Sequence, residues 1–364
     1  MVRGERQDEG REVEEPVYEV IGAEALNPAA GEDEGGGAGS ELPARPVDAR
    51  VVMSRALVEI LGTVRSGRFW WQAIVVLLAS LGVALVTVLA ATAGDVPPEA
   101  PGAVYLVTAM VLVVVSCVLA VRWARHPAVT DDGRQRPGDA LFLGWAVACG
   151  RGAVFAALAA LFLLGLAFAT KSLPVIAGVA SVLALLEFLV FGAIGAGTLW
   201  CFSKNRGRAV AWSLAFLLLV GNILTVAALL PAVRASERVL VAVNIERDDA
   251  GRLVSWQCLP ELRGFTEVYH TERIDWIAAS NPLVLFSLLA GDSESQDEAL
   301  AWLPGEMQNA ADGSQVPCVE GREPSGTGAE LPLAAVGIAM QMALGGVFVA
   351  GGYSAAKRRA ASGG

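Results

Sequence analysis

Two long apolar segments joined by a short basic turn constrain the fold of this chain more than any other feature. The segments run from Leu173 to Leu230, and the turn between them reads Cys201-Phe-Ser-Lys-Asn-Arg-Gly-Arg208. Each segment can cross the hydrocarbon core of a bilayer, about 30 Å thick, which takes roughly 20 apolar residues in a helix. Short loops rich in Lys and Arg stay on the cytoplasmic side. We therefore expect a transmembrane hairpin whose turn faces the cytosol.

The rest of the chain repeats this pattern, since 54% of its 364 residues are hydrophobic and its mean hydropathy is +0.52. An ordinary globular protein is less apolar. The prediction is an all-α polytopic membrane protein with six transmembrane helices, located in the plasma membrane. The charge rule places the N- and C-termini in the cytosol and the loop between spans five and six outside it. The expected spans cover residues 69–93, 103–121, 152–169, 175–200, 209–230 and 331–353.

Charge separates the soluble segments from the spans. The net charge of −10 comes mainly from residues 1–50, with five Arg against thirteen acids, and from residues 234–330, with seven Arg against seventeen acids. Such acidic segments offer no basic surface for nucleic acid. The segments that we expect are a disordered acidic cytosolic tail (1–48), an amphipathic interfacial helix (49–67), spans one to five (68–231) with a cytoplasmic region (122–151), an extracytoplasmic loop (232–330), and span six with a basic cytosolic end (331–359).

The amphipathic helix is predicted from apolar residues at helical spacing that face away from charged ones. The apolar set is Met53, Leu57, Ile60, Leu61 and Val64, and the charged set is Arg50, Arg55, Glu59 and Arg65. The segment is too short to span a bilayer, so we expect it to lie along the inner leaflet, next to the lipid headgroups. A plain linker helix is the alternative.

Two charged residues interrupt the apolar segments. Arg151 divides the stretch from Asp139 to Thr170, and an ionisable residue at the bilayer centre is costly. We therefore expect a surface helix over residues 140–150 and a separate span that starts near Gly152. Glu187 lies inside the fourth span and must face protein or water. An interhelical hydrogen bond is the favoured interpretation, and a substrate path or a proton site is the alternative.

The loop between spans five and six holds three informative segments. Residues 239–245 have the composition of a strand. The apolar segment 276–290 is too short to span, so we expect a re-entrant or interfacial helix there, and backbone of the re-entrant kind must be covered by protein or water. Cys258 and Cys318 are a candidate disulfide, because disulfides persist outside the cytosol.

The sequence lacks the common catalytic signatures. It has no HExxH, GxSxG or CxxC motif, and its two histidines, His126 and His270, are expected on opposite sides of the membrane. We therefore expect no enzymatic activity, no cofactor and no metal site in this chain. A proton-driven pump would need a cluster of intramembrane carboxylates, whereas Glu187 is alone in the predicted spans. Energy for any transport would come from another protein.

Three segments carry a resemblance to a known family. They are Pro137-Gly-Asp-Ala-Leu-Phe-Leu-Gly-Trp145, Phe191-Gly-Ala-Ile-Gly-Ala-Gly-Thr-Leu-Trp-Cys-Phe-Ser-Lys-Asn-Arg-Gly-Arg208 and Trp276-Ile-Ala-Ala-Ser-Asn-Pro-Leu283. Together with the layout of residues 50–359, they resemble the permease subunit of the type 2 ATP-binding-cassette (ABC) exporters. The segment at 137–145 falls where that family's coupling region ends, the segment at 191–208 resembles its small-residue helix end and basic turn, and the segment at 276–283 is similar to its Asn-Pro segment before the sixth span. Two features depart from the family, because Trp145 stands where relatives often carry Lys, and the loop between spans five and six is longer and more acidic.

The resemblance implies that the chain takes part in transport, in the direction of export, and that a partner protein drives it. Two such subunits, or this chain with a paralogue, would form the translocation path in the lipid bilayer. A separate ABC ATPase would press on the cytoplasmic coupling surface, for which the resemblance points to residues 128–150. The residues expected at the ATPase contact are Arg134, Arg136, Asp139 and Trp145, and the intramembrane polar candidates for the translocation path are Glu187, Asn222 and Gln341.

Two other classes of protein stay open at this point. A membrane sensor or regulatory protein would use residues 234–330 as its input and the acidic tail as its output. A scaffold that recruits partners would need only its surface. An ATPase that purifies with the chain would discriminate transport from both alternatives.

Overall fold

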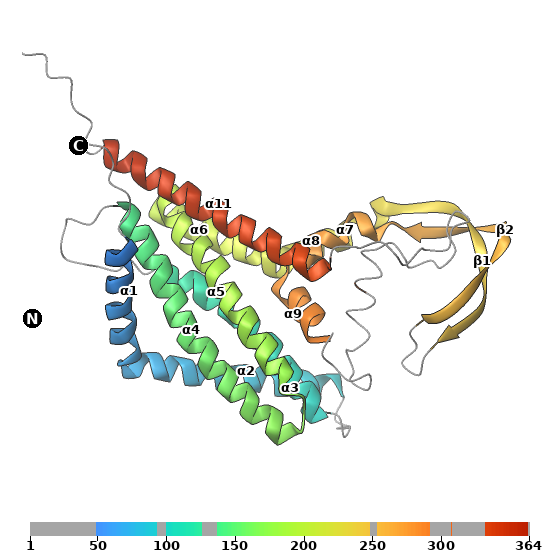
Figure 1. Cartoon of the computed structure of the whole chain (residues 1–364), viewed down its shortest axis with the longest axis horizontal. Coiled ribbons are helices and arrows are strands. Elements are labelled where there is room, and N and C mark those ends of the chain that lie inside the picture. The colour runs from blue at the N-terminus through green and yellow to red at the C-terminus, as the bar shows by residue number, and fades with distance from the viewer. Residues whose placement is uncertain are drawn as a thin grey trace, which may run out of the picture. The chain divides into compact units, whose positions relative to one another are not determined.

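The computed structural model describes residues 49–92, 100–125, 137–247, 253–291, 307 and 332–362. Six helices in these ranges are long and apolar enough to cross a membrane, which confirms the predicted six-span α-helical fold (Figure 1). The chain is therefore a multi-pass membrane protein, and the side of the membrane that each loop occupies stays a prediction. In chain order the spans are α2 (Gly67–Ala91), α3 (Ala100–Ala124), α4 (Pro137–Thr170), α5 (Val175–Cys201), a fifth span made of α6 (Lys204–Phe216), the π-helical turn η1 (Leu217–Gly221) and α7 (Asn222–Leu229), and α11 (Leu333–Ser362).

Helix α5 lies at the centre of the bundle and contacts α3, α4, α6 and α11. Its residues 190–198 are all buried. Gly195 lies against the backbone of Val121 on α3, and Gly197 lies against the backbone of Phe348 on α11. Small residues allow such close approach between membrane helices, so this glycine-rich end of α5 packs tightly against both neighbours.

The outward faces of the spans are apolar, as lipid contact requires. In a soluble protein a contiguous apolar surface of this extent would be a liability. Large apolar side chains with more than half of their surface exposed occur on five of the six spans; they include Leu78, Val86 and Leu89 on α2, Leu161 and Phe168 on α4, Val182 on α5, Phe216 and Leu224 on the fifth span and Val347 on α11.

Helix α4 corrects one prediction, because it continues without a break through Arg151. The expected boundary between a surface helix at 140–150 and a span from Gly152 is therefore wrong. The physical reason is a partner from another helix. Glu59 on α1 (Ala49–Val64) accepts a hydrogen bond of 3.2 Å from Arg151 Nη2, and Thr63 Oγ1 accepts a second one of 2.8 Å from the same nitrogen. Pairing lowers the cost of keeping a guanidinium group against apolar surroundings.

Helix α1 packs on α4 through a face that includes Ile60 of the predicted apolar set but not the exposed members of that set. Val52 and Ala56 are buried against Leu143 and Val147 of α4. In contrast, the predicted apolar residues Met53, Leu57 and Leu61 are all more than half exposed. Helix α1 therefore has one face packed on α4 and a neighbouring apolar face that remains available to lipid.

The basic turn between spans four and five is shorter than its sequence suggests. Helix α5 ends at Cys201 and α6 begins at Lys204, so that only Phe202 and Ser203 connect them and the basic residues lie in the first turns of α6. Gly207 permits this tight connection, since a Cβ atom there would lie 2.6 Å from the carbonyl oxygen of Thr198.

The loop between the last two spans forms a hairpin followed by a helical pair. Strands β1 (Arg234–Arg247) and β2 (Leu253–Tyr269) pair antiparallel with several register shifts, which confirms the predicted strand at 239–245. Before and after them lie the short turns η2 (Leu230–Val233) and η3 (Thr271–Arg273). Helices α8 (Asp275–Ala279) and α9 (Pro282–Gly291) then form the apolar segment.

Helices α8 and α9 pack inside the bundle. Helix α8 contacts α7 and α11, and α9 contacts α3, α5 and α11. Leu285 and Phe286 have no exposed surface. Pro282 is the first residue of α9, a position where its missing N–H costs nothing. Of the two predicted arrangements for residues 276–290, this packing fits a re-entrant pair better than a helix lying on the surface.

Candidate functional site

A carboxyl group and an amide face each other at the centre of the bundle. Glu187 of α5 and Gln341 of α11 are both fully buried. Gln341 Nε2 donates a hydrogen bond of 3.1 Å to Glu187 Oε1 and one of 2.9 Å to the carbonyl oxygen of Ser280. The thiol of Cys117 on α3 lies 3.6 Å from the other carboxyl oxygen, Oε2, and 3.4 Å from the carbonyl oxygen of Val113, so these two acceptors share its one proton. Each carboxyl oxygen thus has a donor within reach, which a buried carboxyl group requires.

The break between α8 and α9 continues this cluster toward the fifth span. Asn281 is fully buried, and its Nδ2 donates to the carbonyl oxygen of Leu219 at 2.8 Å and to Asn222 Oδ1 at 3.0 Å. Its Oδ1 accepts a hydrogen bond of 2.8 Å from the backbone N–H of Leu283. That last bond is the N-cap interaction typical of Asn. A single side chain therefore starts α9 and holds it to the fifth span.

The fifth span contributes through its π-helical turn. The backbone N–H of Asn222 bonds to the carbonyl oxygen of Leu217, five residues earlier, as a π-helix does. Asn222 Nδ2 lies 3.4 Å from Ser280 Oγ. Because the Ser280 carbonyl accepts from Gln341, the hydrogen bonds form one connected set. We call it the polar network and define it as Cys117, Glu187, Asn222, Ser280, Asn281 and Gln341.

The polar network brings together the three predicted intramembrane residues, Glu187, Asn222 and Gln341. Their shared location was not predicted, because they lie on three different spans. Sequence reasoning missed Cys117, Ser280 and Asn281 as members. The Asn-Pro pair and the position of a polar residue beside the break were the available signals for Ser280 and Asn281. For Cys117 the sequence offers no signal.

The predicted ATPase contacts are only partly described. Arg134 and Arg136 lie outside the described residues. Asp139 is half-buried in the first turn of α4. Trp145 packs inward, since its Nε1 donates a hydrogen bond of 2.9 Å to the carbonyl oxygen of Leu189 on α5. Its ring also borders an apolar groove of about 290 Å³ between α4, α5 and α11. A direct contact of either residue with an ATPase stays a prediction.

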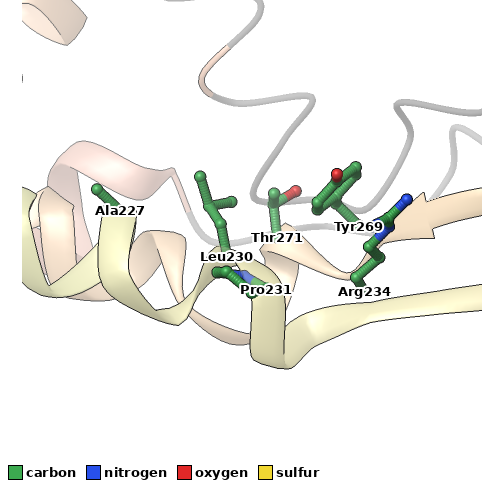
Figure 2. Close-up of a pocket in the computed structure, with 6 residues that line it drawn as sticks. All are labelled: Ala227, Leu230, Pro231, Arg234, Tyr269 and Thr271. Atoms are coloured by element: carbon green, nitrogen blue, oxygen red, sulfur yellow. The ribbon is translucent and has the colours of Figure 1, made fainter.

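A second cavity, of about 590 Å³, lies at the base of the hairpin. Figure 2 shows Arg234 and Tyr269 side by side at one end of it and Leu230 and Pro231 near the other. The guanidinium carbon of Arg234 lies 5.9 Å from the centre of the Tyr269 ring, and Arg234 also pairs with Glu267. The contacts of Arg234 with the Tyr269 ring and with the Glu267 carboxylate hold the two strand ends together where the pairing of β1 with β2 begins.

The structure describes one of the two cysteines of the predicted disulfide. Cys258 lies on β2 and is disulfide-bonded, whereas Cys318 lies outside the described residues, so their pairing stays a prediction. Cys117, Cys149 and Cys201 are free thiols in or beside the spans.

Comparison with known proteins gives no assignment, since no protein-family model matches the sequence and no curated protein matches it. Within the described ranges, no group of three or more His, Cys, Asp or Glu side chains could hold a metal ion. The chemistry that the polar network offers is hydrogen bonding between helices.

Proposed function

We propose that this chain is the membrane-spanning permease subunit of an ABC transporter, acting in export and driven by a separate ATPase. The observation that carries the proposal is the break between α8 and α9. Asn281 ties it to the fifth span through Leu219 and Asn222, and Ser280 ties it to the sixth through Gln341. A helical pair inserted between the last two spans, combined with an amphipathic helix before the first, is the layout of the family that the sequence resembles.

The contacts of α4 support a route from the coupling region to the interior. Helix α4 is continuous from Pro137 to Thr170 and is joined to α5 through the Trp145–Leu189 hydrogen bond. Leu189 is two residues from Glu187 in the polar network. A displacement at the start of α4 would therefore reach the bundle centre through packed side chains, because packed interiors are resistant to compression. The second permease subunit, a copy or a paralogue, would complete the translocation path.

The first experiment is purification of the full chain from native membranes in several mild detergents. We expect a soluble ATPase to co-purify at a comparable amount. Charge reversal at Arg134 and Arg136 should then lower ATPase recovery, or uncouple hydrolysis from transport, while insertion stays intact. Arg55→Glu is the matched control, because Arg55 lies on the exposed face of α1. Recovery without any ATPase in every detergent would contradict the proposal.

A sensor function is the second candidate, and the hairpin with its cavity of about 590 Å³ favours it. Arg234 and Tyr269 would then contact an extracytoplasmic ligand. In that case the chain would purify without an ATPase, and substitution of Tyr269 would change a regulatory output.

A further inference from the structure

A basic pocket of about 330 Å³ lies where α1, α2, α3 and α4 meet. Arg68 comes from the first turn of α2, Arg122 from the last turn of α3, and Arg151 from α4. Three guanidinium groups from three spans therefore converge on one cavity. The approach of like charges costs electrostatic energy, which an anion bound among them would offset.

The positive charge of the pocket is only partly compensated. Arg151 pairs with Glu59 at 3.2 Å and donates to Thr63. Arg68 and Arg122 are exposed, and neither forms an ion pair with any carboxylate in the described ranges. One carboxylate thus faces three guanidinium groups. Free donors that point toward an anion bind it with charge-assisted hydrogen bonds.

The electrostatic surroundings reinforce this excess. Arg125 follows the last turn of α3, three residues after Arg122. Burial, and then the nearby positive charge of Arg208, lower the pKa of Arg125. The proximity of Arg208 means that the first turns of α6 add positive charge to the same end of the bundle.

The pocket also has neutral polar side chains and an apolar floor, although the Ser66 hydroxyl already donates to the carbonyl oxygen of Thr63 at 2.6 Å. Ser66 and Gln72 line it beside the arginines, and Phe69 and Trp123 form its buried base. The Trp123 ring stacks on Phe188 of α5 with centroids 5.4 Å apart, which holds the base rigid. A cavity of this kind presents cationic and polar groups at its mouth and aromatic carbon beneath them.

The location matches the headgroup level of a bilayer. The pocket lies at the beginning of span α2 and the end of span α3, where both leave the apolar region. Trp70 and Trp71 follow Phe69 and are 40% and 68% exposed, and tryptophan prefers this level of the membrane. The exposed apolar face of α1, defined above by Met53, Leu57 and Leu61, lies on the helix that leads into the same corner (Figure 1).

We propose that this pocket binds the phosphate group of an anionic phospholipid, with Arg68 and Arg122 as the charged contacts and Gln72 as a neutral donor. Basic pockets between transmembrane helices hold anionic headgroups by this chemistry. The acyl chains would lie along the exposed apolar surfaces of α1 and α2. A soluble phosphate ester shares the phosphate chemistry but would leave those apolar surfaces unused. The site does not depend on transport, so it stands or falls independently of the proposed function.

The test is lipid binding by the full-length chain in phosphatidylcholine nanodiscs. Short-chain fluorescent phosphatidylglycerol is titrated, with fluorescent phosphatidylcholine as the comparison. We expect phosphatidylglycerol to bind at least about ten-fold more tightly, since both lipids carry the phosphate but the choline cation of phosphatidylcholine is repelled by the arginines. The double variant Arg68→Gln/Arg122→Gln should lose this preference, whereas Arg122→Lys should keep most of it. Arg55→Gln, also on the same side of the bundle, should bind like the unmodified chain.

Two further arms complete the experiment. Added inorganic phosphate at millimolar concentration should not displace the lipid; displacement would assign the phosphate chemistry to a soluble source instead. Size-exclusion profiles check folding, and the single variant Arg68→Gln replaces the double variant if the latter does not fold. Equal binding of the two lipids, or equal loss of binding in Arg55→Gln, would overturn the proposal.

Discussion

Gln341 on α11 donates a hydrogen bond of 3.1 Å to Glu187 on α5, across 154 positions in the sequence and with both side chains fully buried. The same Gln341 nitrogen holds the Ser280 carbonyl at the break between α8 and α9. One amide therefore links the fourth span, the sixth span and the helical pair. Within the described residues its own oxygen, Oε1, is buried without a donor, so the amide is held through its nitrogen alone.

Gln341→Leu should destabilise the protein. The substitution keeps the volume of the side chain but leaves Glu187 Oε1 and the Ser280 carbonyl without a donor, and each unsatisfied buried group costs about 1–3 kcal/mol. We expect a lower midpoint of thermal or denaturant unfolding in detergent. Met342→Leu, at the neighbouring exposed position of α11, is the control and should leave the midpoint unchanged. Equal midpoints for both variants would show that the bond contributes nothing.

Asn281→Ala should loosen the helical pair without unfolding the spans. The variant loses the N-cap of α9 and both donors to the fifth span, and a lost N-cap alone costs about 1 kcal/mol. Hydrogen exchange should rise in residues 275–291 more than elsewhere. Ser287→Ala is the control, because among the described residues the Ser287 hydroxyl donates only to the Leu283 carbonyl, in the preceding turn of its own helix. If exchange rises equally in the two variants, the cross-span contacts of Asn281 are not what holds the pair.

Glu59→Gln should release α1 from α4. The neutral amide no longer balances Arg151, whose side chain is only 15% exposed. Because Glu59 itself is one-third exposed, we expect the loss of stability to lie between the values for a surface ion pair and for a buried one, at about 1–2 kcal/mol. Hydrogen exchange over residues 49–64 measures it, with Arg55→Gln as the control on the exposed face. Protection of α1 that is the same in Glu59→Gln as in the control would argue against the pair as the anchor.

Gly337→Ala should disrupt the contact between α11 and α8. A Cβ atom at Gly337 would collide with the backbone carbonyl of Ala279, which has no rotamer that could move away. Overpacking of this kind costs about 1–3 kcal/mol. Gly165→Ala on α4 meets no atom within 4 Å, so it should be neutral or slightly stabilising, because Ala is the better helix former. Unfolding midpoints of the two variants in detergent decide the matter, and a stable Gly337→Ala protein would contradict the close approach.

The start of α8 should be more stable at acidic pH. Burial, and then the nearby Glu272, raise the pKa of Asp275 to about 6. This lies above the value of an unfolded chain, about 3.9, so the folded form binds the extra proton. The stabilisation of the folded form by protonated Asp275 is fully present below about pH 4 and is lost as the pH rises through about 6. After correction for intrinsic rates, hydrogen exchange in residues 275–279 should be faster at pH 7 than at pH 5.

Two variants check the assignment to Asp275. Asp275→Asn should remove the pH difference, because the amide does not titrate in this range. Glu272→Gln should move the transition to lower pH, since one of the two causes of the shift is gone. A pH difference that persists in Asp275→Asn would assign the titration to another group.

Features that depend on local composition were predictable. The six spans follow from apolar segments of sufficient length, because the cost of exposing backbone to hydrocarbon leaves helices as the only local solution. The strand at 239–245 also agrees with the prediction, since the composition of a strand is readable from neighbouring residues.

Features that depend on a distant partner were missed. Arg151 was expected to divide α4, and it does not, because its partner Glu59 lies 92 residues earlier in the chain. The face of α1 that packs on α4 could not be chosen, since Val52 and Met53 are equally apolar neighbours and only the position of Leu143 distinguishes them. The hydrogen bond from the Trp145 indole to the Leu189 carbonyl likewise joins residues 44 positions apart, so it could not be read from either segment alone.

The sequence by itself therefore determined that the chain crosses a membrane six times and which polar residues enter the apolar region, because burial in lipid is decided residue by residue along each span. Only the tertiary structure decided that Glu187, Asn222, Asn281 and Gln341 meet at one point and that Arg68, Arg122 and Arg151 share one pocket. Those contacts depend on how each helix is oriented about its axis when it packs against its neighbours. That orientation is set by contacts between residues far apart in the chain.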